Sequence, residues 1–229
     1  MKALTCILTL IFTCSLPFKG VCQTRSEHMI WLQATEKVQF NPTVSGLVLV
    51  QKRLFTERAQ TYQDLIWVSG DYQLKHLKAG GGMMYFSYHK RLASSFKAVP
   101  ELRPFQYLTY GGRMATSLWT YHIRAMVEQR FLSQVTGDEL ATGKDFQLRY
   151  RLRCNTTFEL APHTLLKLGN EFLWAHEMEL VQNRATAELT YAFRPFGLAV
   201  GYMNWYVKGI RQPWRHSWLL KISHRLKMR

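Results

Sequence analysis

The chain has 229 residues, 47% of them hydrophobic, and its 30 Lys and Arg residues outnumber its 15 Asp and Glu residues, giving a formal net charge of +15. No Ser/Gly-rich stretch or run of one charge divides the sequence, so we expect a single domain. Such a charge is typical of proteins that bind nucleic acid, anionic lipid or an anionic substrate, and it does not choose among them.

The first residues have the layout of a secretory signal peptide. Lys2 precedes the apolar run Ala3 to Phe12, and charged or small residues begin at Lys19. We expect cleavage near Cys22 or Gln23, a signal peptide over 1–23 and a barrel domain over 24–229. The alternative is a buried N-terminal helix. After the leader, no segment approaches the roughly 18 apolar residues of a membrane helix, so we expect no helical anchor.

Only Cys154 among the four cysteines lies beyond the leader, so we expect neither an internal disulfide nor a zinc site. We also expect no other metal and no cofactor.

The rest of the chain consists of long segments in which apolar and polar residues alternate, as in β-strands, and no sustained helical stripe is present. The segments are Met29 to Glu36, Val44 to Phe55, Thr61 to Tyr72, Leu77 to His89, Pro104 to Met114, Tyr121 to Ser133, Phe146 to Leu160, Thr164 to Glu177, Arg184 to Phe193, Gly197 to Val207 and His216 to Leu226.

Tight connections, such as Ala161 to His163, alternate with longer ones, such as Lys90 to Arg103 and Gln134 to Asp145. Tight turns at one rim and long loops at the other are typical of transmembrane β-barrels. A soluble β-sandwich is the alternative, but its strands average about six residues. The longer segments here could cross a membrane at a tilt. We therefore predict an all-β fold, a single antiparallel transmembrane β-barrel.

The two faces of Phe146 to Leu160 differ sharply. One face carries Phe, Leu, Tyr and Cys, and the other carries three arginines. In a barrel, the apolar face meets lipid and the charged face lines the lumen, where opposite charges must pair. The same alternation in neighbouring segments predicts a lumen charge network of Arg124, Glu128, Arg130, Arg149, Arg151, Arg153, Glu171 and Glu188.

Several stretches resemble an uncharacterised family of Gram-negative outer-membrane β-barrels, a domain of unknown function. They are HMIWLQAT, MVEQRFL, RYRLR, LGNEFLW, GLAVGYMNWY and HSWLLKISHRL. The resemblance implies an outer-membrane location and no activity. Two features depart from such barrels: the chain continues past Leu226 without a terminal aromatic residue, and eleven segments break the even count. We expect ten strands, with Met29 to Glu36 not a full barrel strand, or twelve if two strands are merged.

Motifs for chemistry are weak. Outer-membrane lipid hydrolases need a Ser nucleophile beside a His base, and enzymes of this class resemble one another in carrying His and Ser two residues apart. None of the eight histidines has Ser two residues later, and adjacent pairs such as His216 and Ser217 point to opposite faces. Glu128 and Glu171 could form an acid/base pair, but among so many arginines we read them as structural counter-ions. Gly80 to Gly82 lacks the P-loop pattern and indicates a strand bend or close packing.

We therefore expect an outer-membrane protein, not an enzyme, that is structural or ligand-binding and has a narrow salt-bridged lumen. The alternatives are a small anion-preferring channel and a lipid-modifying enzyme. The expected partners are outer-membrane lipid, the barrel-insertion machinery and periplasmic chaperones. We expect a monomer and no nucleic-acid binding, because the basic residues are spread over many strands rather than gathered in a patch.

Overall fold

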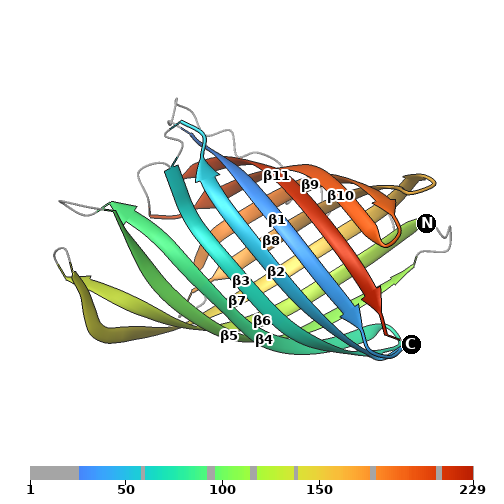
Figure 1. Ribbon diagram of the computed structural model, residues 1–229, viewed down its shortest axis with the longest axis horizontal. Coiled ribbons are helices and arrows are strands. Elements are labelled where there is room, and N and C mark those ends of the chain that lie inside the picture. The colour runs from blue at the N-terminus through green and yellow to red at the C-terminus, as the bar shows by residue number, and fades with distance from the viewer. Residues whose placement is uncertain are drawn as a thin grey trace.

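The computed structural model describes residues 26–57, 60–91, 96–113, 118–136, 139–175, 179–209 and 213–228. The proposed signal peptide lies outside these residues. The described chain is all β, as predicted, and its strands wrap into one closed barrel (Figure 1). The strands are β1 (Glu27–Gln39), β2 (Val44–Phe55), β3 (Gln60–Leu74), β4 (Leu77–Arg91), β5 (Phe96–Arg113), β6 (Trp119–Thr136), β7 (Glu139–Ala161), β8 (Thr164–Trp174), β9 (Leu180–Phe193), β10 (Phe196–Val207) and β11 (Trp214–Lys227).

The barrel closes between β1 and β11, which run parallel from the pair Glu27 and Arg215 to the pair Gln39 and Lys227. Consecutive strands pair antiparallel, so an odd number of strands leaves the first and last running in the same direction. The count of eleven lies between the ten and twelve expected, and the expectation that Met29 to Glu36 is not a full barrel strand is wrong. An even number of strands is the rule for bacterial single-chain barrels. Parallel pairing is only slightly less stable per residue and can close the sheet.

We call the end of the barrel with the connections 40–43, 75–76, 114–118, 162–163 and 194–195 the turn rim, and the opposite end the hairpin rim. The segments 90–103 and 134–145, expected to be long loops, are largely strand. β4 continues to Arg91 and β5 begins at Phe96. β6 continues to Thr136 and β7 begins at Glu139. Figure 1 shows these two hairpins projecting beyond the other strands. The prediction of long loops was wrong because strand pairing persists where the apolar alternation fades.

Burial follows the predicted alternation. In β7 and β11, Phe146, Leu160, Trp218 and Leu220 are exposed on the outer face, whereas Arg149 is buried inside. Large apolar side chains cover much of the outer face of the other strands in the same way, among them Val48, Val50, Ile66, Val68, Met83, Tyr85, Leu108, Ile123, Leu189 and Leu198. This outer surface suits a hydrocarbon environment. The described residues include no helix long and apolar enough to cross a membrane.

Gly82 lies in β4 where β3 passes very close. A methyl group on Gly82 would overlap the carbonyl oxygen of Val68, whereas a methyl group on Gly70 in β3 would meet no atom within 4 Å. The Gly80 to Gly82 run therefore serves close packing, one of the two structural readings of the sequence.

Candidate functional site

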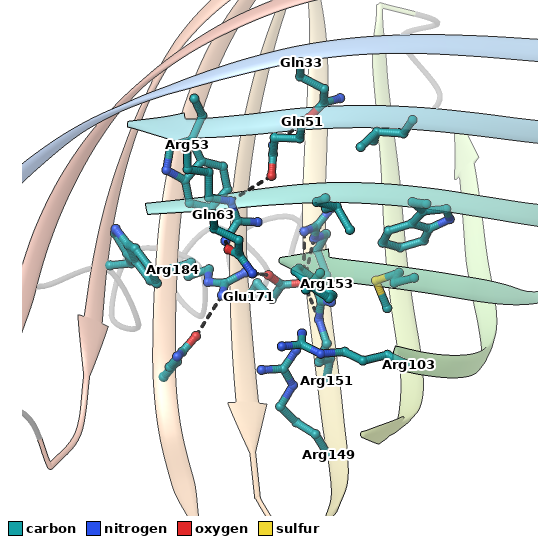
Figure 2. Close-up of a pocket in the computed structure, with 18 of the residues that line it drawn as sticks. Gln33, Gln51, Arg53, Gln63, Arg103, Arg149, Arg151, Arg153, Glu171 and Arg184 are labelled. Carbon is teal, nitrogen blue, oxygen red and sulfur yellow. Dashed lines mark hydrogen bonds and ion pairs between the residues drawn. The ribbon is translucent and has the colours of Figure 1, made fainter. Parts of the chain in front are cut away.

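The inner faces of the strands enclose a cavity of about 800 Å³ (Figure 2). Its lining includes residues from every strand, and along β4 it extends from Lys78, near the turn rim, to Lys90, near the hairpin rim. The cavity therefore follows almost the full length of the barrel. Within the described ranges, no three His, Cys, Asp or Glu side chains gather closely enough to hold a metal ion.

Glu128 on β6 is the centre of the first group of ion pairs and is 0% exposed. Its carboxylate accepts a hydrogen bond of 2.8 Å from Arg149 Nε and another from Arg151 Nη1. Arg103 Nη1 lies 3.6 Å away. β6 and β7 bring these groups together because Glu128 lies opposite Arg149 in their register. One buried carboxylate thus serves three guanidinium groups.

Glu171 on β8 is the centre of the second group. It accepts hydrogen bonds from Arg151 Nη2 at 2.5 Å, from Arg153 Nε at 3.0 Å and from Arg184 Nη1 at 3.2 Å. Arg151 therefore bridges Glu128 and Glu171, and the two groups form a continuous network across β6 to β9. Each carboxylate is again shared by several cations.

A third group involves two residues that sequence reasoning missed, Glu101 and Arg103 on β5. Glu101 accepts hydrogen bonds of 2.6 Å from Arg103 Nε and 2.6 Å from Arg130 Nε. The alternation of this stretch was a usable signal, but Pro100 and Pro104 obscured it, because proline argues against a strand interior. Both prolines belong to the outward-facing set, and the inward-facing residues between them complete the network.

The remaining predicted residues, Arg124 and Glu188, lie nearer the turn rim. Arg124 Nε donates a 3.0 Å hydrogen bond to Thr109 Oγ1, and its guanidinium lies 4.5 Å from the ring centre of Tyr107. Glu188 accepts a hydrogen bond from Lys221. Among the described residues, Arg124 forms no ion pair with a carboxylate, in contrast to Arg130, Arg149, Arg151 and Arg153 of the predicted set.

Cationic side chains greatly outnumber carboxylates along the cavity. The cations are Lys37, Arg53, Lys78, Lys90, Arg103, Arg124, Arg130, Arg149, Arg151, Arg153, Lys167, Arg184, Lys208 and Lys221, and the carboxylates are Asp71, Glu101, Glu171 and Glu188. When Glu128, which lies behind this lining, is counted as well, positive side chains in the lumen still greatly outnumber negative ones. A cavity of this charge, walled by a low-dielectric barrel, attracts anions and repels cations.

A second polar cluster lies near the hairpin rim, on the strand face that alternation turns outward, and its His89 also borders the lumen cavity. Asp64 Oδ2 lies 2.8 Å from His89 Nε2, and Lys52 Nζ lies 4.0 Å from Asp64 Oδ1. Ser87 is the register partner of Asp64 and shares a face of β4 with His89. The pattern of Ser two residues after His does not identify this cluster, because here Ser87 precedes His89 and Asp64 comes from another strand.

In a comparison with protein families, the family described as "Protein of unknown function (DUF2490)" matches residues 28–216. This range starts in β1 and ends in β11, so it includes the strands on both sides of the closing pair. A search of curated proteins found no match.

Proposed function

Because the chain belongs to the DUF2490 family of proteins of unknown function, we propose its role from its own geometry. It is an outer-membrane β-barrel whose narrow lumen binds small anions and lets them pass. The signal-like leader and the apolar outer surface support the outer-membrane location. The turn rim then faces the periplasm and the hairpin rim faces outward, as in other barrels with short periplasmic turns.

The observation that carries this proposal is the positive excess along a cavity that follows the barrel from rim to rim. An ion that enters a narrow lumen loses hydration, and fixed charges of opposite sign must compensate for that loss. Within the part of the chain that the structure describes, Arg124 offers its charge without an ion-paired carboxylate, and Glu128 and Glu171 are each shared among several arginines. The network therefore holds the guanidinium groups in place and leaves net positive charge for an anion.

The same network also supports the competing structural role, in which side chains plug the lumen. Single-channel recording of the refolded protein in a planar bilayer separates the two. Under a KCl gradient, we expect steady current steps and a reversal potential whose sign shows that chloride is more permeant than potassium. Arg124→Gln should reduce the anion preference. Lys52→Gln, which removes a charge from the outer face, should leave it unchanged.

Two results would contradict the permeation proposal. A barrel that shows heat-modifiable gel migration, and so is folded, but carries no current has a plugged lumen. A reversal potential whose sign shows that potassium is more permeant than chloride means that the arginines do not control which ions cross.

The outer cluster supports a second candidate function, hydrolysis of a lipid ester. Ser87 would be the nucleophile, His89 the base and Asp64 the group that orients His89. In β4 the cluster follows the exposed Met83 and Tyr85, which places it at the hairpin-rim edge of the apolar surface, a depth at which lipid ester groups lie. Acyl release from phospholipid in mixed micelles tests it. Activity that persists in Ser87→Ala would rule out this role.

A further inference from the structure

Several N–H groups in the hairpin-rim half of the lumen have no acceptor among the described residues. They are the indole N–H groups of Trp31 and Trp205, the amide nitrogen of Gln63 and Nε of Arg184. Trp31 is 6% exposed, Trp205 2% and Gln63 1%. Buried donors without acceptors are costly to a folded protein and call for an explanation. All four residues line the same cavity.

These donors lie around Arg53, which is 7% exposed. Its Nε donates to Gln51 Oε1 at 2.8 Å and its Nη1 to Gln63 Oε1 at 2.5 Å, and its guanidinium lies 3.7 Å from the ring centre of Trp31. No described carboxylate pairs with Arg53, and the positive charge of Arg184 is near enough to repel it. Figure 2 shows Arg53 and Gln63 reaching into the cavity from one wall and Arg184 from the other.

The ring contacts join these groups into one site. The rings of Trp31 and Trp205 lie 5.8 Å apart, edge to face, and the guanidinium of Arg184 lies 5.1 Å from the ring centre of Trp205. Donors and two cations from β1, β2, β3, β9 and β10 thus converge, and Glu171, the carboxylate that pairs with Arg184, is shared with Arg151 and Arg153. A bound anion would supply the acceptors and neutralise the repulsion between Arg53 and Arg184.

The two walls of the cavity differ in character. The wall of β2 to β4 presents the apolar side chains Leu47, Leu49, Leu65, Trp67, Met84 and Phe86. The wall of β7 to β9, on the other side of the strand circle, presents Arg149, Arg151, Arg153, Lys167 and Arg184. An inorganic anion would use only the cationic and polar groups, which include Arg53 and Gln63 of the first wall. A ligand with an anionic head and an apolar body would use the apolar side chains as well.

We propose that this lumen site binds a small organic carboxylate. Its carboxylate lies between Arg53, Gln63 and Arg184, and its apolar body lies along Leu65 and Trp67. The inference rests on the proposed function, since it names the class of anion that the lumen takes. The whole cavity, of which this site is one part, has a volume of about 800 Å³, which leaves room for a small molecule.

Calorimetric titration of the refolded protein in lipid nanodiscs tests this assignment, with empty nanodiscs as the blank. The probes are benzoate, acetate, which has the head without the body, and benzamide, which has the body without the charge. We expect benzoate to bind at least about tenfold more tightly than acetate, and benzamide to show no binding.

Arg53→Gln should weaken benzoate binding at least about tenfold, because a charge-assisted contact is lost. The matched control is Lys52→Gln, which removes a charge from the neighbouring outward-facing residue and should change the affinity less than about twofold. If Arg53→Gln fails to fold, Trp31→Phe removes the indole N–H and keeps a smaller aromatic ring, and it should also weaken binding.

Equal affinity for benzoate and acetate in a barrel that conducts anions would overturn this inference and leave the proposed function intact. Equal affinity for benzoate and benzamide would overturn it as well, because the site would then not recognise the carboxylate. Failure of both carboxylates to bind, together with a loss of anion preference in the bilayer recording, would overturn both proposals.

Discussion

Glu128→Gln is the most informative test of the buried network. The substitution keeps the size of the side chain and one acceptor oxygen, and it removes the negative charge together with the other acceptor oxygen. Arg103 and Arg151 retain a second carboxylate, in Glu101 and Glu171 respectively, whereas Arg149 pairs with Glu128 alone among the described residues. The expected damage is therefore one stranded guanidinium in a buried position.

Breaking a buried ion pair by removing one partner costs about 3 to 5 kcal/mol. Because only one of the three guanidinium groups loses its last carboxylate, we expect a loss near the lower end, about 3 kcal/mol of unfolding free energy. The double variant Glu128→Gln/Arg149→Gln removes the stranded charge as well. It should recover about half of that loss if the stranded charge is the cause.

The assay is urea-induced unfolding and refolding in lipid vesicles, followed by tryptophan fluorescence. Glu179→Gln is the matched control, because Glu179 makes the same kind of ion pair with Lys208 but both side chains are more than half exposed. Surface pairs contribute little, so the control midpoint should not move. If Glu128→Gln were as mild as Glu179→Gln, the network would not hold the barrel together and our reading of its energetics would be refuted.

Three other expectations follow from the strand faces and the packing. Leu152→Arg, on the outer face, should destabilise the barrel by about 2 to 4 kcal/mol if it lies near the membrane midplane, and a refolding titration that tolerates it without loss would contradict the assignment of faces. Arg151→Leu should also destabilise the barrel in the same titration, because Glu128 and Glu171 would lose the cation that joins them. Gly82→Ala should cost about 1 to 3 kcal/mol through overlap with Val68, whereas Gly70→Ala should be neutral, and equal midpoints for the two glycine variants would contradict the close approach of β3 and β4.

The sequence predicted the features that depend on the two-residue alternation of side chains along a β-strand. Alternation places Arg149, Arg151 and Arg153 on one face whatever the neighbouring strands do, so the inner and outer sets could be read directly from Phe146 to Leu160. Glu101 and Arg103 were missed because two prolines and a weak apolar face hid their strand. Met29 to Glu36 was not expected to be a full barrel strand because a rule about strand number outweighed a clear local pattern.

Contacts between distant strands could not be predicted in this way. The approach of Arg53 to Arg184 depends on how the strands close into a barrel. The sequence around either residue contains no sign that a second cation lies across the lumen. The cluster of Asp64, Ser87 and His89 depends on the register between β3 and β4, which a one-residue slip would destroy.

The parallel pairing of β1 with β11 has a consequence for sidedness. The chain enters β1 at the hairpin rim and leaves β11 at the turn rim. In a membrane, the residues before β1 and those after β11 would then face different compartments. A label attached before β1 and one attached after β11 should therefore be accessible from opposite sides of the bilayer. In this respect the eleven strands act as one net crossing, like a single transmembrane helix.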